Sequence, residues 1–136
     1  MADVTITAAN VQTSSAQTKS GIAGVAITAG QSLYQSAADS NKLHLAKADT
    51  SIDAACVGVA LNNAAAGQPV FYQAQGLITI GGTVVIGTPY VVSGANAGGI
   101  APWSDLVTGN KVTFIGYATT AGILNLAIQN TGVASP

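Results

Sequence analysis

Short runs in which apolar residues alternate with small or polar ones recur along most of the chain. This period of two is typical of β-strands that bury one face. The clearest example is the uncharged stretch 56–81, in which Val57, Val59 and Leu61 alternate with smaller residues. The Asn-Asn and Gly residues that follow favour a turn, because both residue types tolerate left-handed backbone angles. The stretch therefore predicts three strands, joined by a turn and by a tight bend at Gly76.

The same alternation predicts strands in the rest of the chain, at 21–28, 31–35, 43–46, 90–93, 106–107, 112–117 and 123–128. Pro69 and Pro89 stand at the first position of their strands, where the missing N–H costs little. A hairpin turn is expected at 108–111, a loop at 94–102 and a loose tail at 130–136.

Only residues 47–55 suggest a helix, of one or two turns, with Thr50 or Asp49 as its cap. The predicted fold is thus all-β, a compact barrel or sandwich of short antiparallel strands with at most one short helix.

The first twenty residues differ from the rest, since 10–20 carry almost no apolar side chains. We interpret 1–20 as an extended, flexible N-terminal arm and 21–136 as the β-barrel-like body. Val4 and Ile6 alternate with Thr residues and are candidate interface residues, because they would suit a strand that joins an exposed sheet edge. A frayed terminus without a partner is the alternative.

Charge is scarce: 7% of the residues are charged against 49% apolar, and the net charge is −1. The chain has no Arg and no Glu. Binding of DNA or RNA is not expected, because it needs several cationic contacts with phosphates. A surface with so few charges is expected to be apposed to another protein, or covered by Ser, Thr, Asn and Gln.

Membrane insertion is not expected either, since no run approaches the roughly 18–20 apolar residues of a spanning helix. The first residues lack the basic region and apolar core of a signal peptide.

Few residues carry chemistry. The single cysteine, Cys56, begins an apolar strand and is expected to be a small buried side chain. His44 lacks a Cys or carboxylate partner in the sequence pattern, so we expect a structural residue on the outer face or at a subunit contact. Asp49 and Asp53 fit helix capping better than calcium, which needs six to eight oxygens. No catalytic, metal-binding or cofactor-binding residue is therefore predicted, and an enzyme is not expected.

Trp103 is the only tryptophan and follows a loop of small residues. It is the third candidate interface residue, because buried tryptophans often anchor protein contacts. The alternative is that it plugs one end of the core.

The order of several turn-and-strand motifs resembles the small head-decoration, or capsid cement, proteins of tailed bacteriophages. These motifs span residues 21–128 and read Ala-Gly-Gln-x-Leu-Tyr, Val-Gly-Val-Ala-Leu-Asn-Asn-Ala-Ala-Ala-Gly-Gln-Pro-Val, Gly-Thr-Pro-Tyr-Val-Val, Gly-Gly-Ile-Ala-Pro and Ile-Gly-Tyr-Ala. The resemblance implies a compact barrel or tulip-shaped domain that trimerises on the outer capsid surface of the virion, after synthesis in the bacterial host cytoplasm. It also implies that the chain bridges major capsid protein subunits, without catalytic residues or a small-molecule substrate.

The composition agrees with such a role, since three linked copies gain from effective concentration even when each contact is weak. We hypothesise that residues 1–20 widen the contact by strand addition to the shell. Two other classes stay open. One is another structural virion β-domain, in the tail or a fibre. The other is a carbohydrate- or surface-binding module, which the seven aromatic residues, mostly in predicted strands, do not favour.

Overall fold

The computed structural model describes residues 3–13, 18–50 and 52–135. These residues form two antiparallel sheets and three single-turn 3₁₀ segments, η1 (Ala8–Asn10), η2 (Ala37–Asp39) and η3 (Trp103–Asp105), with no α-helix among them. The prediction of an all-β barrel or sandwich of short antiparallel strands is confirmed.

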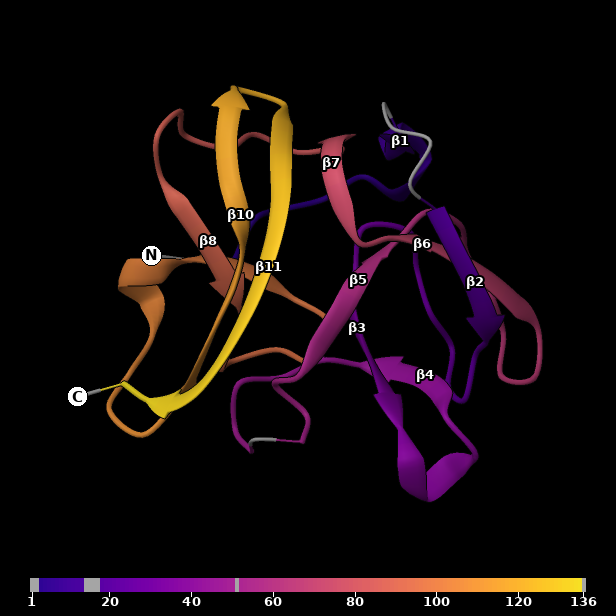
Figure 1. The fold of residues 1–136 in the computed structure, drawn as a ribbon. Coiled ribbons are helices and arrows are strands. Elements are labelled where there is room, and N and C mark those ends of the chain that lie inside the picture. The colour runs from indigo at the N-terminus through magenta and orange to yellow at the C-terminus, as the bar shows by residue number, and fades with distance from the viewer. Residues whose placement is uncertain (1–2, 14–17, 51, 136) are drawn as a thin grey trace.

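The first sheet has six strands and includes the long C-terminal hairpin, orange to yellow in Figure 1. Its order is β1 (Gln12–Thr13), β7 (Gln75–Thr79), β11 (Ile123–Ala134), β10 (Lys111–Thr120), β8 (Pro89–Val92) and β9 (Ile100–Pro102). Breaks in register between Phe114 and Gly116, and at two other places in the hairpin, mark bulges that bend its strands.

The second sheet has five strands and lies beside the first (Figure 1). Its order is β2 (Thr18–Ile22), β6 (Pro69–Gln73), β5 (Cys56–Ala60), β3 (Ser32–Ser36) and β4 (Lys42–Leu45). A parallel bridge between Ala23, just past β2, and Leu43 of β4 connects the two edge regions of this sheet. The five-stranded sheet is therefore nearly closed on itself, as in a small barrel.

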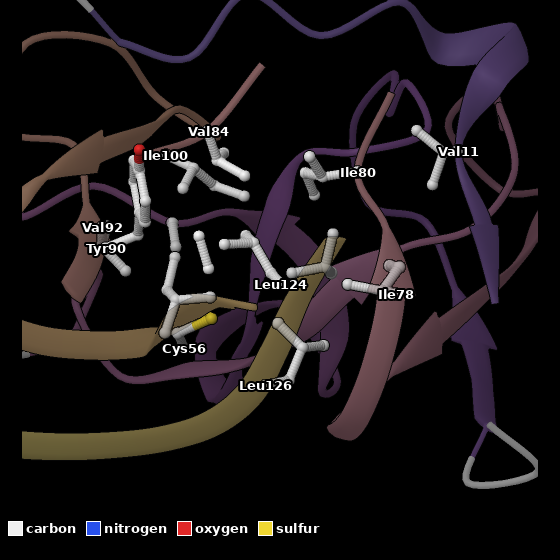
Figure 2. Packing of buried hydrophobic residues seen from close by; sticks show 14 of the residues in the cluster. Val11, Cys56, Ile78, Ile80, Val84, Tyr90, Val92, Ile100, Leu124 and Leu126 are labelled. Atoms are coloured by element: carbon white, nitrogen blue, oxygen red, sulfur yellow. The ribbon is translucent and has the colours of Figure 1, made fainter. Parts of the chain in front are cut away.

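Two apolar clusters form the core. The larger lies between the sheets and joins Cys56 and Val59 of the five-stranded sheet to residues of the six-stranded one, including Ile78, Tyr90, Leu124 and Leu126 (Figure 2). The smaller lies inside the five-stranded sheet and contains Leu33, Leu43, Val70 and Tyr72 among others. In most strands a cluster takes alternate positions, as the sequence pattern predicted. The segment around β5 departs from it: Val59 and Leu61 face the larger cluster, whereas Val57 packs against the smaller one, because the pairing with β3 shifts register between Leu33 and Tyr34.

Several strand predictions are confirmed almost to the residue. Pro69 and Pro89 open β6 and β8. The body begins earlier than its predicted boundary at residue 21, because Thr18 already pairs with Gln73 of β6. Gly76 lies inside β7 with a positive φ of 88° rather than in a bend before it.

Several other predictions are wrong. The strand expected at 21–28 ends at Ile22, where β2 ends. The described residues of the range 47–55 form no helix: Ala54 N–H donates to Thr50 O in a single turn, and the chain then enters β5. Residues 106–107 are not a strand: Val107 begins a turn in which its N–H donates to Asn110 Oδ1 and its carbonyl accepts from Asn110 N–H. Residues 130–134 of the expected loose tail belong to β11, whose Ala134 lies opposite Lys111. The expected loop at 94–102 is also shortened, since Ile100–Pro102 forms β9.

Candidate functional site

The outer face of the six-stranded sheet, turned away from the core, carries exposed apolar side chains. Leu77 of β7 lies opposite Asn125 of β11, which lies opposite Tyr117 of β10. Directly opposite residues of antiparallel strands share a face. The Asn125 Nδ2 donates a hydrogen bond to the Tyr117 hydroxyl at 2.8 Å, which holds this exposed ring in place. Leu77 and Tyr117 are both exposed, so this row presents apolar surface to a partner.

A second row crosses the same face towards the edge strand β9. Phe114 of β10 lies opposite Val91 of β8, and Val91 lies opposite Ala101 of β9. Val91 and Ala101 are buried although they belong to neither core cluster. Val91 and Ala101 are therefore covered by other side chains on the outer face, at the end of the sheet next to β9.

Trp103 lies at this end, in η3, directly after β9. Its side chain is 58% exposed. The alternative that it plugs the core is therefore wrong, while its role as an interface anchor stays a prediction. The tryptophan borders a groove of about 300 Å³ lined by Trp103, Ser104, Leu106, Val112, Phe114 and Ser135. We call this the Trp103 groove. None of the six lining residues carries a charge.

A short apolar projection adjoins the outer face at the other end of β10. Val85 and Ile86 are 60% and 67% exposed. Val85 N–H donates to the Tyr90 hydroxyl at 2.8 Å, and Ile86 forms a bridge with Ala118 of β10. These contacts fix the loop, so two adjacent apolar side chains are presented to solvent in a defined position.

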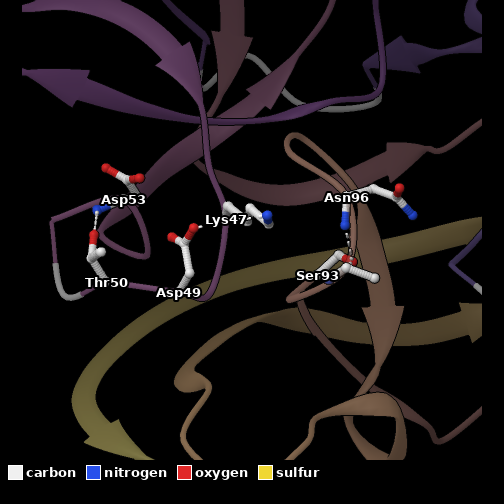
Figure 3. Close-up of polar contacts among 7 residues, drawn as sticks. Lys47, Asp49, Thr50, Asp53, Ser93 and Asn96 are labelled. Carbon is white, nitrogen blue, oxygen red and sulfur yellow. Dashed lines mark hydrogen bonds and ion pairs between the residues drawn. The ribbon is translucent and has the colours of Figure 1, made fainter.

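The charged residues lie mainly elsewhere, in the segment 39–53 around β4. Lys47 Nζ is 3.8 Å from an Asp49 carboxylate oxygen, and Asp53 N–H donates to Thr50 Oγ1 at 3.1 Å (Figure 3). Thr50 therefore caps a turn, as expected, although no helix follows. Burial, with a smaller contribution from the Asp53 carboxylate, raises the pKa of Tyr34 nearby.

His44 has a partner that the sequence pattern did not indicate. Its Nε2 lies 2.8 Å from Asp39 Oδ2, across the turn that joins β3 to β4. Ser40 and Asn41 in that turn adopt positive φ angles, which bring the two side chains together. The ring centroid of Tyr34 is 5.9 Å from that of His44. The expectation of a histidine without a carboxylate partner is thus wrong.

Cys56 is almost completely buried in the larger core cluster, as predicted (Figure 2). Burial raises the pKa of its thiol to about 11, from an ordinary value of 9.0. Among the described residues, no three His, Cys, Asp or Glu side chains come together as a metal site would require. No helix in the described part of the chain is long and apolar enough to cross a membrane.

Val4 and Ile6 lie on the body rather than apart from it. Both are partly buried against the larger core cluster. Val4 and Pro102 line a cavity of about 560 Å³, which shares no lining residue with the Trp103 groove. The structure therefore separates two of the candidate interface residues from the third.

The comparisons with known proteins identify no relative: no protein-family model matches the chain, and a search of curated proteins found no match.

Proposed function

We propose that this chain is a capsid decoration protein that binds the outer surface of a tailed-phage head. In this role it bridges major capsid protein subunits and stabilises the shell, with three copies associating as a trimer. The proposal rests on the resemblance of residues 21–128 to that family. Its main structural support is the apolar, nearly uncharged outer face of the six-stranded sheet.

A decoration protein needs contact area rather than chemistry. Exposed Leu77, Trp103 and Tyr117 supply the apolar area that a protein partner would remove from water, at about 25 cal/mol per Å². Aromatic side chains at the centre of such a contact dominate its binding energy. We therefore assign the shell contact to this face and to the Trp103 groove.

This assignment differs from the hypothesis that residues 1–20 bind the shell by strand addition. Residues 3–13 already lie on the body of their own chain, where Gln12 and Thr13 pair with β7. One edge of this segment is thus already paired within the chain, whereas the outer face has no neighbour in the described structure.

The proposal is tested by sedimentation of decorated heads. Heads assembled from the major capsid protein of the phage that encodes this chain are mixed with the purified protein and pelleted, and bound copies are counted by gel densitometry. Trp103→Ala is expected to reduce the affinity at least about tenfold, because a hot-spot aromatic contributes about 2 kcal/mol or more.

The matched control is Phe71→Ala. Phe71 is also aromatic and exposed, but it lies on β6 of the five-stranded sheet. It should bind heads like the unaltered protein. If the unaltered protein does not bind heads at all, the proposed function is wrong; if both variants bind equally well, the assignment to the outer face is wrong.

A further inference from the structure

The N-terminal segment, residues 3–11, lies in a groove on the body. Val4 N–H donates to Ile100 O and Thr7 N–H donates to Gly81 O, both at 2.8 Å. The two acceptors belong to β9 and to the loop after β7, which are distant in sequence. The segment is therefore held as an extended ligand would be, by main-chain bonds to its walls.

A carboxylate anchors the start of the segment. Ser93 Oγ donates to Asp3 Oδ1 at 2.9 Å, and Asn96 Nδ2 donates to Asp3 Oδ2 at 3.1 Å. Ser93 is buried, and its Oγ also accepts the Asn96 N–H at 3.2 Å (Figure 3). This arrangement fixes which residue of the segment occupies that end of the groove.

Apolar side chains anchor the rest. Val4 and Ile6 pack against the larger core cluster, and Val11 is itself buried in it. Thr5 and Thr7, between and after them, are exposed. Only one side of the segment contacts the body, which is the alternation expected of a bound strand.

Glycines give the groove its shape. A Cβ atom at Gly82 would collide with the Thr5 carbonyl oxygen, and one at Gly81 with that of Thr7. A Cβ at Gly99 would collide with the Asp3 carboxylate. A larger residue at Gly81 or Gly82 would collide with the main chain of the segment, so the groove is matched to this segment, which turns at η1. We call it the N-terminal groove.

We propose that the N-terminal segment is a detachable ligand of the N-terminal groove, and that copies of this chain are linked when the segment of one copy occupies the groove of another. Terminal segments held by a local set of contacts open without global unfolding. An empty groove would expose the apolar cluster that contains Ile80, Val84 and Ile100, so it is refilled by the same sequence from either copy.

In dilute solution the segment of the same chain has the higher effective concentration and fills the groove. Where copies are held close together, the segment of one copy competes for the groove of its neighbour. This exchange links the two copies. The expectation that exchange occurs on a phage head rests on the proposed function; the binding of a separate segment does not.

A labelled peptide tests the binding directly. The peptide Asp-Val-Thr-Ile-Thr-Ala-Ala-Asn-Val, residues 3–11, carries a fluorophore and is titrated with the full-length Ile6→Asp chain. Because this substitution places a charge against the apolar cluster, its own segment is released. Saturable binding measured by anisotropy is expected. A peptide with the same Ile6→Asp change, or a chain that also carries Gly82→Val, should bind at least about tenfold more weakly.

Exchange between full-length chains is tested by complementation. The Ile6→Asp chain has an intact groove, and the Gly82→Val chain has an intact segment but a blocked groove. In native mass spectrometry, an equimolar mixture should give complexes that contain both chains. These should be at least about tenfold more abundant than the complexes that either chain forms on its own.

Absence of peptide binding to a folded Ile6→Asp chain would overturn the proposal, as would the absence of mixed complexes. Circular dichroism establishes folding, and the milder Ile6→Ser chain repeats the experiment. If both variants unfold, the segment is an inseparable part of the core and the proposal is equally wrong. None of these measurements uses phage heads, so their failure leaves the proposed function to its own test.

Discussion

At the scale of single residues, the long hairpin depends on a glycine at its bulge. A Cβ atom at Gly116 would collide with the main-chain carbonyl of Asn125 on the paired strand. Gly122, in the turn of the same hairpin, has open space around its Cα. The two glycines therefore provide a matched pair, one required by the close approach of two strands and one not.

We predict that Gly116→Ala lowers the free energy of unfolding by about 1–3 kcal/mol, because the extra methyl group forces the strands apart. Gly122→Ala should change it by less than about 0.5 kcal/mol. Urea unfolding followed by tryptophan fluorescence measures both. Equal effects in the two variants would contradict the role assigned to the bulge.

The buried thiol of Cys56 should make the stability of the protein depend on pH. This thiol has a raised pKa in the folded protein, so the native state holds the proton more tightly than the unfolded chain does. The resulting stability is present below the unfolded pKa of about 9 and is lost as the pH rises towards about 11. Since the thiol is completely buried, the loss should be roughly 2–3 kcal/mol.

Thermal and urea unfolding between pH 8 and about 11 measure this loss. Tyr34 and Tyr72 also have raised pKa values, because of burial, and contribute in the same direction. The Cys56→Ala chain controls for them and should show a shallower fall. Identical pH profiles for the two chains would contradict the thiol's contribution.

At the scale of elements, the C-terminal strand connects the hairpin to the other sheet. Asn130 Nδ2 donates to Cys56 O at 3.4 Å, and Thr131 Oγ1 donates to Val112 O. Ala134 lies opposite Lys111 at the far end of β10. Asn130 and Ala134, which were expected to belong to a loose tail, are thus held opposite β10.

A chain that ends after Gln129 should therefore be less stable. We predict a fall in Tm of at least about 5 °C by scanning calorimetry, from the loss of strand pairing and of both side-chain bonds. Removal of Pro136 alone is the control and should leave Tm unchanged. An unaltered Tm after the longer truncation would show that the last part of β11 adds no stability.

The sequence predicted elements whose signal is local. Pro69 and Pro89 open strands because of their own geometry, and alternation identified the strands 31–35 and 123–128. Residues 130–134 were missed because their pairing depends on Lys111 and Thr113, which no local pattern indicates. Residues 47–55 have helical propensity, but Ala48 is buried in the larger core cluster and Ala54 is buried beside β10, where its carbonyl accepts from Thr113, and this tertiary context overrides the propensity.

The candidate surface was predicted only in part, for the same reason. Trp103 was identified because it is unique and follows a loop. Tyr117 and Leu77 were assigned to strands, but their common face follows from the register of β7, β10 and β11, which is not visible in the sequence. The bond between His44 and Asp39 likewise depends on the two positive φ angles between them.

At the scale of the whole molecule, most charged residues lie away from the outer face, although Asp105 lies beside Trp103 in η3. The segment 39–53 contains three of the five Asp and two of the four Lys, whereas 54–104 contains none. A contact made by the outer face should therefore depend little on electrostatic attraction.

We predict that binding to phage heads changes less than about threefold between 0.05 and 0.5 M NaCl, because salt screens charge pairs but not apolar contact. Sedimentation at each salt concentration measures it, with the Trp103→Ala chain as the reference for weakened binding. A steep fall in affinity with salt would instead assign the contact to the charged segment.

The most direct measurement is a cryo-electron microscopy reconstruction of heads decorated with this chain, at a resolution that orients the two sheets. The account predicts that the outer face of the six-stranded sheet, with Leu77, Trp103 and Tyr117, is covered by major capsid protein or by a neighbouring copy. A reconstruction in which this face points to solvent, while the segment 39–53 contacts the shell, would contradict it.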